Sequence, residues 1–426
     1  MKAALLKALG KKNKYLQHKN EIEYSSDESD GSLSSEDESE ISKDWVYKWL
    51  NSRYLIVKYL GRGTFCRTWL AYDINEFSFV ALKMYFPKYY EDSLNELKIN
   101  NKLVTNNHVV KLLDNFLYEH HNCLVFQLLG ITILDLNDYY DSKIPLNILK
   151  KIIYQTTMGL DELHKNNIIH CDLKPENIML DCLPNIIKEI TNLSGLKESY
   201  LKFVSDNLPE GYESFNKSKK KKVKKKVKTK SNNLFSELLK NRISDLNEND
   251  RTFKVNEEDI NVYLIDLGNS EILGNDNEDE IMIRSYRPPE NIMNNFYNEK
   301  ADIWSLGCII YELLTDEYLF DIDRDLSYND KNRLHLAQME EFLGKIPKEL
   351  SLTCDFKRDL FDSKGNILGF SCNTDIYKNI STKLQTDFSY SEQDSIELSE
   401  FLKVFFEYNY RNRSSAENIL TNKWFQ

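Results

Sequence analysis

The octapeptide from His170 to Asn177 constrains this chain more than any other feature of its sequence. It reads His-Cys-Asp-Leu-Lys-Pro-Glu-Asn, and it places a carboxylate (Asp172), a cation (Lys174) and an amide (Asn177) close together. A site that moves a phosphoryl group needs these three types, because a hydroxyl must lose its proton, the migrating group must be neutralised and a metal ion must be held. We therefore predict that Asp172 is the base, Lys174 the phosphate contact and Asn177 a metal ligand.

Two upstream segments predict a place for phosphate groups. Gly61 and Gly63 lie between strand-like segments, as in a glycine loop that covers phosphates, although Cys66 and Thr68 replace the usual third glycine and valine. Such a pair of glycines is by itself more often an ordinary turn. Fifteen positions after Thr68, the strand-like segment Val-Ala-Leu-Lys ends at Lys83, which is predicted to anchor the α and β phosphates.

A helix and a further strand are expected to complete this region. Glu96, thirteen positions beyond Lys83, is the predicted ion-pair partner of that lysine, with Glu91 as the fallback. The apolar run that ends at Phe126 predicts a strand that enters a connector at 127–130, where backbone groups can bond an adenine edge. Phe126 is expected to wall the rear of that pocket.

Further motifs surround and follow the octapeptide. Apolar residues at helical spacing after Pro145 predict a buried helix that leads into it, and His170 is expected to serve loop geometry and not the chemistry. A short strand ending at Ile265 delivers Asp266, the second predicted metal ligand. Arg413 lies where protein kinases, which these motifs resemble, keep an arginine that forms a bidentate ion pair with a glutamate, here Glu290.

Together these motifs resemble those of eukaryotic protein kinases. The octapeptide is close to the pattern HRDLxxxN, and the Asp-Leu-Gly at Asp266 is close to DFG. Among kinases, the chain is most similar to the SR protein kinases, a branch of the CMGC group, over about residues 45–182 and 261–426. The features that carry this likeness are Asn51–Asp73, Leu267, Asn269, Tyr286, Arg287, Tyr318–Phe320, Glu341–Pro347 and Arg413–Phe425.

The resemblance implies an α+β, two-lobed kinase fold with a β-rich N-lobe and an α-rich C-lobe. The expected segments are a disordered acidic extension (1–44), the N-lobe and hinge (45–130), the first part of the C-lobe with the catalytic loop (131–182), a disordered, basic, low-complexity spacer insert (183–260), and the second part of the C-lobe with the activation segment and docking region (261–426). An insert of this kind costs the fold little, because loop-closure entropy grows only with the logarithm of length.

The resemblance also implies an activity and its site. The expected function is that of a serine/threonine kinase that uses ATP and Mg²⁺ to phosphorylate serines of arginine/serine-rich proteins in mRNA splicing or RNA processing. The implied catalytic residues are Asp172 and Lys174, and the implied metal ligands are Asn177 and Asp266. The implied nucleotide contacts are Leu60, Gly61, Gly63, Thr68, Ala81, Lys83, Glu96, Gln127, Leu129 and Met179.

Three departures from the kinase pattern keep alternatives open. Another CMGC kinase, CLK-like or DYRK-like, is one alternative, and a pseudokinase scaffold is another, motivated by Cys66, Thr68 and Cys171. Cys171 stands where an arginine normally binds a phosphate on the activation segment, and a thiol cannot bind one in this way. We therefore predict activity without activation-segment phosphorylation, as is typical of SR protein kinases.

Charge is distributed unevenly along the chain. Residues 1–44 carry seven basic and ten acidic side chains and residues 183–260 carry seventeen and twelve, which leaves −13 on the remainder of a chain whose net charge is −11. An acidic remainder should attract an arginine-rich substrate, in a salt-dependent manner. The acids expected to form a docking groove are Asp321, Asp323, Asp325, Asp330, Glu340 and Glu341, although Lys331, Asn332 and Arg333 stand where the family tends to place acids.

Two low-complexity segments carry their own predictions. The lysine run at 217–230 is either a solvated linker or a nuclear import signal or anionic docking segment. Ser25, Ser26, Ser34 and Ser35 precede acids and are candidate targets of an acid-directed kinase.

Composition bounds the class of protein. The 426 residues are 41% hydrophobic, and no apolar run approaches the roughly 20 residues of a membrane-spanning helix. The seven cysteines include no CxxC pair, which fits a reducing compartment. We expect a monomer in the cytoplasm and nucleus, without membrane attachment or direct binding to nucleic acid.

Overall fold

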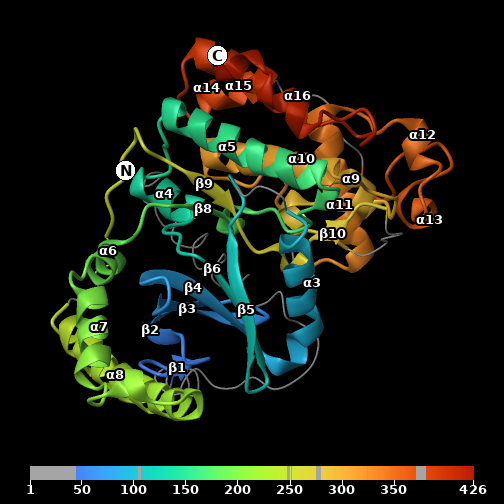
Figure 1. The fold of residues 1–426 in the computed structure, drawn as a ribbon. Helices are drawn as coiled ribbons and strands as arrows, with labels where there is room; N and C mark the ends of the chain where they lie inside the picture. Colours follow the sequence, from blue (N-terminus) through green and yellow to red (C-terminus); the bar gives the residue numbers. More distant parts are fainter. Residues whose placement is uncertain are drawn as a thin grey trace. The chain divides into compact units, whose positions relative to one another are not determined.

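The computed structural model describes residues 45–103, 107–246, 250, 252–274, 280–323, 325–370 and 380–426. The predicted acidic extension at 1–44 lies outside these residues. The chain forms two compact units from interleaved segments (Figure 1). Unit 1 contains the described residues up to Ser93, Leu112–Leu128 and Asn185–Thr252, and unit 2 contains those of Leu94–Lys111, Leu129–Pro184 and Phe253–Gln426.

Unit 1 is built on an antiparallel sheet in the order β1-β2-β3-β4-β6-β5. Its strands are β1 (Trp49–Leu50), β2 (Tyr54–Arg62), β3 (Cys66–Asp73), β4 (Ser78–Tyr85), β5 (Leu112–Tyr118) and β6 (His121–Gln127). In β4 the side chains alternate as a strand requires, so that Val80, Leu82 and Met84 are buried while Ala81 and Lys83 are half-buried. The buried set packs with Trp69 and Val125 in one core cluster on a single face of the sheet.

The insert between the two kinase-like segments is helical and not disordered. It forms α6 (Asn185–Thr191), α7 (Leu196–Asp206), η3 (Tyr212–Ser214) and α8 (Lys217–Ser244). The predicted disorder of residues 183–260 is therefore wrong for most of this segment. The physical reason lies in the second half of α8, where Val227, Ser231, Phe235, Leu239 and Ile243 recur every fourth residue and are all buried.

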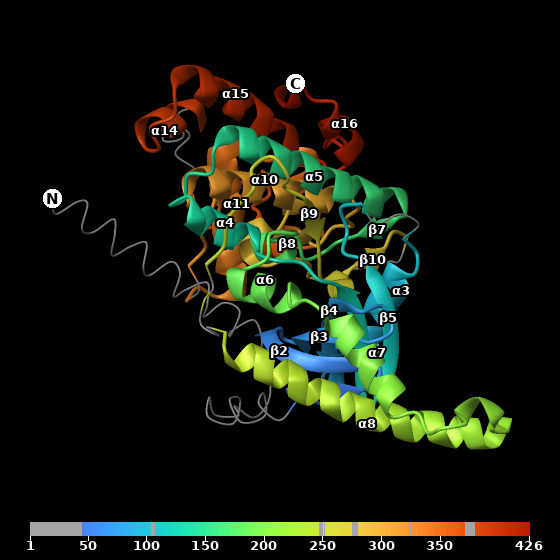
Figure 2. The same ribbon diagram turned by 60° about the vertical axis from the view of Figure 1, so that its left-hand side comes forward.

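The insert helices belong to unit 1 and pack against its strands. The Phe235 ring lies 5.3 Å from that of Tyr72 on β3 and 5.6 Å from that of Tyr200 on α7, centroid to centroid. Trp49 Nε1 donates to Ser236 Oγ at 2.7 Å. Figure 2 shows α8 running beside the sheet, with its N-terminal end extending beyond the strands. This packing stabilises the second half of α8, since helices gain most of their stability from a buried apolar face.

Unit 2 is mainly helical. Its longer helices are α5 (Leu146–Lys165), α10 (Lys300–Thr315), α11 (Tyr328–Leu343) and α15 (Glu392–Leu402). The shorter elements are α4 (Ile133–Tyr139), α9 (Pro289–Ile292), α12 (Lys348–Ser351), α13 (Lys357–Leu360), α14 (Ile380–Thr386), α16 (Ala416–Leu420), η2 (Pro175–Asn177), η4 (Leu267–Asn269), η5 (Arg284–Tyr286), η6 (Lys403–Phe405) and η7 (Lys423–Phe425). Two helical elements remain. η1 (Pro87–Tyr89) belongs to unit 1, and α3 (Tyr90–Asn100) crosses from unit 1 into unit 2 after Ser93.

The core of unit 2 forms around α5 and α10. The helix predicted after Pro145 is confirmed as α5, and Leu149, Ile152, Ile153, Leu160 and Leu163 are buried as expected, whereas the predicted core residue Leu146 is half-buried at the start of the helix. Almost every residue of α10 is buried, including Asp302. No helix within the described ranges is both long and apolar enough to cross a membrane.

Two short antiparallel pairs frame the octapeptide in unit 2. β7 (Ile168–Ile169) comes directly before it and pairs with β10 (Glu271–Ile272). β8 (Ile178–Leu180) comes directly after it and pairs with β9 (Val262–Leu264). Residues far apart in the sequence are thereby brought to the same loop.

Candidate active site

The pairing of β8 with β9 brings two predicted metal ligands together. Ile178 lies opposite Leu264, and the backbone N–H of Ile265 donates to the carbonyl of Asn177 at 3.0 Å. Asn177 precedes β8 and Asp266 follows β9, so both side chains start from the same end of this hairpin. The insert separates them along the chain but leaves the hairpin intact.

Asp172 is held by three donors on one of its two carboxylate oxygens. Its Oδ2 accepts from Lys174 Nζ at 2.9 Å, from Asn177 Nδ2 at 3.2 Å and from Asn269 Nδ2 at 3.4 Å. Among the described residues no hydrogen bond to Oδ1 is found. Because Asp172 is only 8% exposed, this arrangement fixes its carboxylate and leaves Oδ1 as the oxygen that can accept a proton.

Lys174 is kept charged beside this carboxylate. Burial by itself lowers the pKa of Lys174, but the attraction of Asp172, with smaller contributions from Glu176 and Asp266, outweighs burial and raises the pKa above its ordinary value. The ammonium group is therefore a permanent positive charge in the octapeptide. It can neutralise an anionic group that arrives next to Asp172.

His170 organises the loop, as predicted, and is fully buried. Its Nδ1 lies 3.3 Å from the amide nitrogen of Asp172, and its Nε2 lies 3.1 Å from the carbonyl oxygen of Ile265. The amide can only donate and the carbonyl can only accept, so the proton is assigned to Nε2. The ring thus links the backbone of Asp172 to the strand that delivers Asp266.

Asp302 on α10 holds the start of the octapeptide. Its Oδ2 accepts from the His170 backbone N–H at 2.9 Å and its Oδ1 from the Cys171 N–H at 3.2 Å, while His164 Nε2 lies 2.9 Å from Oδ2. Cys171 has a positive φ of 63°, which is uncommon for a residue other than glycine. The two bonds to a fully buried carboxylate stabilise this turn.

The predicted metal ligands suit a hard cation. The Nδ2 of Asn177 donates to the Asp172 backbone carbonyl at 2.8 Å, which orients the amide and leaves its Oδ1 for a ligand. With the carboxylate of Asp266, this gives one amide and one carboxylate oxygen. Mg²⁺ is commonly bound by one or two carboxylates together with substrate phosphates and water, so this pair fits it. No cluster of three or more His, Cys, Asp or Glu placed to hold a metal occurs in the described part of the chain.

Four predicted nucleotide contacts share a region of the sheet in unit 1. Gly61 on β2 lies opposite Thr68 on β3, and Thr68 lies opposite Lys83 on β4. Ala81, two residues before Lys83, points to the same face. This is the face opposite the buried Leu82. The sheet register therefore brings these four positions together on one side.

The loop between β2 and β3 leaves room for a ligand. A β-carbon at Gly61 would have no atom within 4 Å, and the nearest atom to one at Gly63 would be Cys66 Sγ at 3.7 Å. Neither glycine has a positive φ, so neither the backbone nor the packing of the hairpin requires a missing side chain. Space for phosphate groups is a reason for glycine at both positions. Leu60, next to them, is 38% exposed.

The remaining predicted contacts are divided between the units. Gln127 ends β6 in unit 1, whereas Leu129, Met179 and Glu96 belong to unit 2. Glu96 is 1% exposed and Glu91 is exposed, which favours Glu96 over the fallback, because a buried carboxylate needs a partner. The pairing of Lys83 with Glu96 joins residues of different units and stays a prediction.

Gly130 is required by the packing of unit 2. A β-carbon at this position would lie 1.8 Å from the carbonyl oxygen of Cys182. The Gly130 N–H donates to the carbonyl of Leu180 at 2.7 Å. Thr132 and Met179 form an isolated antiparallel β-bridge. The connector after Leu129 is thereby attached to β8, the strand that follows the octapeptide.

The segment from Glu280 to Arg287 is ordered by an arginine within the segment. Arg287 forms an ion pair with Glu280 at 2.8 Å, and its guanidinium donates to the carbonyls of Ile281 and Met282. The N–H of Met282 donates to the carbonyl of Cys171 at 2.9 Å. Burial raises the pKa of the Cys171 thiol well above its usual value, so the group stays neutral. The position next to Asp172 thus contributes packing and a backbone bond, not charge.

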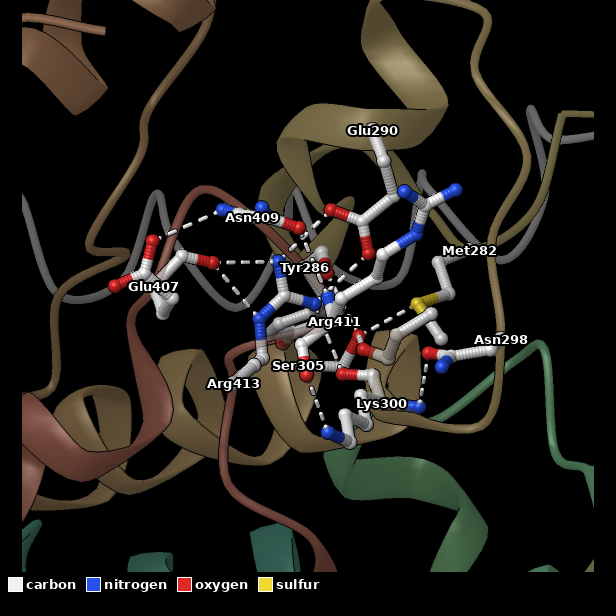
Figure 3. Close-up of polar contacts among 11 residues, drawn as sticks. Met282, Tyr286, Glu290, Asn298, Lys300, Ser305, Glu407, Asn409, Arg411 and Arg413 are labelled. Atoms are coloured by element: carbon white, nitrogen blue, oxygen red, sulfur yellow. Dashed lines mark hydrogen bonds and ion pairs between the residues drawn. The ribbon is translucent and has the colours of Figure 1, made fainter. Parts of the chain in front are cut away.

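The predicted pair between Arg413 and Glu290 is confirmed (Figure 3). Arg413 Nη1 and Nη2 donate to Glu290 Oε1 and Oε2, both at 2.8 Å, and the two side chains are 0% and 1% exposed. The same guanidinium donates to the carbonyls of Glu407 and Lys300. A buried arginine with this many acceptors ties the C-terminal region to α9 and to the start of α10.

Sequence reasoning missed the parts played by Asn269 and Asp302. Asn269 contributed to the family resemblance, but nothing in its spacing indicated a bond to Asp172. Asp302 offered a clearer signal, since it is the acid in the first turn of an otherwise strongly apolar helix. A carboxylate predicted to be buried needs donors, and the nearby octapeptide supplies two backbone N–H groups.

The chain matches known proteins over most of its length. The family model for the protein kinase domain matches residues 54–190 and 253–425. The serine/threonine-protein kinase SRPK of Physarum polycephalum is 32% identical over 89% of this chain and 86% of that protein. Protein kinase dsk1 of Schizosaccharomyces pombe is 27% identical over 88% and 80%, and the probable serine/threonine-protein kinase clkA of Dictyostelium discoideum is 28% identical over 74% and 30%. The gap between the two matched segments lies within the insert.

Proposed function

The chain belongs to the protein kinase family, with relatives among the SRPK-type and other CMGC serine/threonine kinases, and we propose that it phosphorylates serines of arginine/serine-rich proteins. The protein kinase domain together with these serine/threonine kinase relatives makes the chain an ATP-dependent protein serine/threonine kinase. The proposal therefore concerns the substrate. If arginine/serine-rich proteins are the substrate, the kinase acts in mRNA splicing or another step of RNA processing.

The arrangement of Asp172 is the observation that carries the mechanism. A substrate serine next to Oδ1 can give up its proton to this oxygen while its own oxygen attacks the γ-phosphorus of ATP. The new serine–phosphorus bond forms as the bond to the bridging oxygen of ADP breaks. Lys174 neutralises the charge of the phosphoryl group during the transfer. The three donors on Oδ2 keep the base from rotating.

Other residues of the chain orient the donor nucleotide in this proposal. Mg²⁺, when held by Asn177 Oδ1 and Asp266, would neutralise phosphate oxygens and align them for in-line attack. Lys83 would hold the α and β phosphates, and Gly61 and Gly63 would let the backbone approach them. ATP is a substrate in this reaction, and Mg²⁺ binds together with its phosphates.

Exposed acids on unit 2 support an arginine-rich substrate. Asp321, Asp323 and Asp325 precede α11 and are exposed. Two other acids of the predicted groove have structural partners instead, because Asp330 pairs with Arg333 at 3.1 Å and the buried Glu340 accepts from the Ile346 N–H. Glu341 is half-buried, so the proposed docking surface depends mainly on the three aspartates before α11.

Peptide phosphorylation tests the substrate class. We expect kcat/KM for arginine-serine repeat peptides to exceed that for serine-proline and acidic peptides by about tenfold or more, because the exposed acids of unit 2 attract several arginine side chains at once. Steady-state kinetics on purified full-length protein would measure this. A preference for either of the other two classes would exclude the proposal.

A charge variant tests the three exposed aspartates. D321N/D323N/D325N is expected to raise KM for the arginine-serine peptide by about tenfold at low salt and to leave kcat unchanged, since these groups attract the substrate without touching the reacting atoms. The matched control is D141N/D355N/D387N, which removes three other exposed carboxylates. Equal effects of the two variants would show that only net charge matters.

A CLK-like activity is the second candidate. The similarity to clkA of Dictyostelium discoideum favours it, and the same peptide series tests both. A pseudokinase scaffold is the third candidate, motivated by Cys66, Thr68 and Cys171. The arrangement of Lys174 and Asn177 around the Asp172 carboxylate favours an active kinase instead.

We further propose that the protein is a monomer of the cytoplasm and nucleus.

Independence from phosphorylation is a further prediction. The Glu280 carboxylate already neutralises Arg287, and the neutral Cys171 offers no charge for a phosphate to bind. We expect treatment of bacterially expressed protein with a broad phosphatase to leave kcat within about twofold, because no charge-assisted bond depends on a phosphate. Mass spectrometry would verify that the segment carries no phosphate.

The Glu280→Gln variant gives this prediction a matched comparison. This variant removes the carboxylate that pairs with Arg287, so we expect its kcat to fall. Phosphatase treatment of the parent protein should leave kcat unchanged. Loss of activity after phosphatase treatment, restored by rephosphorylation, would show instead that the segment needs a phosphate.

A further inference from the structure

The helix α8 has two halves with different surroundings. The second half is buried within unit 1 through Phe235, Leu239 and Ile243, all at most 3% exposed. The first half, Lys217–Lys230, contains ten lysines and no acid, and we call it the basic half of α8. Eight of these lysines are exposed: Lys217, Lys219, Lys221, Lys222, Lys224, Lys225, Lys226 and Lys230.

The basic half is electrostatically unfavourable as a bare helix. Lysines one turn apart, such as Lys221 with Lys225 and Lys222 with Lys226, repel one another. Positive charge in the first turns also opposes the helix dipole. Among the described residues the one carboxylate paired with this half is Glu213, which lies 3.1 Å from Lys220. Bound anions would relieve this repulsion.

The chain itself contains a segment with the complementary charge. Residues Glu21–Asp44 carry ten carboxylates and a single lysine. They lie outside the described residues, and the described chain starts directly after them at Trp45. The charges of the two segments therefore nearly balance.

The start of the described chain is fastened to α8. Trp49 Nε1 donates to Ser236 Oγ and to the carbonyl of Asn232, and Lys240 Nζ lies 6.0 Å from the centre of the Tyr47 ring. In the sequence, the C-terminal end of the acidic segment, Asp44, is thus only a few residues from side chains that are fastened to the second half of α8. A segment tethered in this way has a high effective concentration at the helix.

The chain length permits the contact. Along the helix, the 19 residues from Ser236 back to Lys217, the far end of the basic half, span about 28 Å. The 24 residues of the acidic segment reach up to roughly 80 Å when extended. The segment can therefore turn back and follow the basic half over its whole length.

We propose that the acidic segment Glu21–Asp44 binds the basic half of α8 of the same chain. The interaction is made of carboxylate–lysine pairs and is screened by salt. Phosphorylation of Ser25, Ser26, Ser34 or Ser35 adds negative charge and strengthens it. The bound segment keeps its acids away from arginine-rich peptides and fastens the insert to the N-terminal part of unit 1.

Zero-length crosslinking of the full-length protein tests this proposal. A carbodiimide joins carboxylates to lysines that are in contact, and peptide mass spectrometry identifies the pairs. In dilute protein at low salt we expect crosslinks from residues 21–44 to 217–230, reduced at least about fivefold in roughly 0.5 M NaCl because the Debye length is then only a few ångströms. An equal mixture of unlabelled and ¹⁵N-labelled protein should give crosslinks within chains, not between them.

A pair of matched variants makes the assignment specific. K221Q/K222Q/K225Q/K226Q should lose most of these crosslinks, whereas K143Q/K357Q/K364Q/K403Q, which removes four other exposed lysines, should keep them. Circular dichroism would check that α8 remains helical in the first variant. Equal yields in both variants, crosslinks only between differently labelled chains, or absent crosslinks together with lysine-dependent binding of poly(U) would each overturn the proposal. The last result would make a nucleic acid the occupant.

Discussion

The Asp172→Asn variant is expected to lower kcat by roughly 10²–10⁴-fold, which is the usual contribution of a general base. Asparagine has the same shape, and its carbonyl oxygen can take the place of Oδ2 among the donors from Lys174, Asn177 and Asn269. Its NH₂ group then occupies the place of Oδ1 and cannot accept the proton of a serine. Initial rates with radiolabelled ATP and an arginine-serine peptide would measure the loss.

ATP binding separates a chemical effect from a folding defect in this variant. No predicted nucleotide contact is changed, so the ATP dissociation constant from calorimetry should equal that of the parent protein. Asp355→Asn, at an exposed position of the same unit, is the matched control and should retain full activity. Undiminished phosphorylation by Asp172→Asn would mean that another group takes the proton or that a contaminating kinase is present.

Breaking the pair between Glu290 and Arg413 is expected to have the largest effect on stability. Glu290→Gln leaves a fully buried guanidinium without its counter-ion, and removal of one partner from a buried pair costs about 3–5 kcal/mol. The free energy of unfolding of unit 2 should fall by this amount, which corresponds to a Tm lower by roughly 10 °C. Thermal and urea unfolding followed by circular dichroism would measure the change.

An exposed pair of the same chemistry provides the control. Lys423 and Glu400 lie 3.3 Å apart with side chains 84% and 57% exposed, so Lys423→Gln should change the stability by less than about 0.5 kcal/mol. Arg413→Lys should resemble Glu290→Gln, because a lysine cannot donate to both carboxylate oxygens and to the carbonyls of Glu407 and Lys300. Wild-type stability in Glu290→Gln would show that the pair contributes little.

The local motifs allowed much of the site to be predicted. The roles proposed for Asp172, Lys174 and Asn177 depend on spacing within one loop, and a short loop leaves few ways to arrange them. The Arg413–Glu290 pair was predictable because a recurring kinase pattern links two positions far apart in sequence. Asn269 and Asp302 were not predicted to hold the loop, since their partners are an oxygen and two backbone N–H groups that only the folded chain brings to them.

The insert was misjudged because composition was averaged over it. Its lysines, asparagines and serines suggested a solvated chain, and the lysine run at 217–230 is indeed exposed for the most part. The buried positions from Val227 to Ile243 are spaced by four residues. One of them, Ser231, is polar, so the apolar stripe is weak in the sequence. The aromatic partners of Phe235, Tyr72 and Tyr200, come from other elements, and sequence alone does not reveal such a contact.

The hairpin of β8 and β9 has a consequence for how such proteins can diversify. Its two strands are joined at their outer end by Asp181 and Asn261, whose backbone and side chains bond to each other, and at their inner end by Asn177 and Ile265. The hairpin is therefore closed at both ends independently of the insert helices between Asp181 and Asn261. The length of that connection can thus change between related chains while the predicted metal ligands Asn177 and Asp266 keep their positions at the other end of the hairpin.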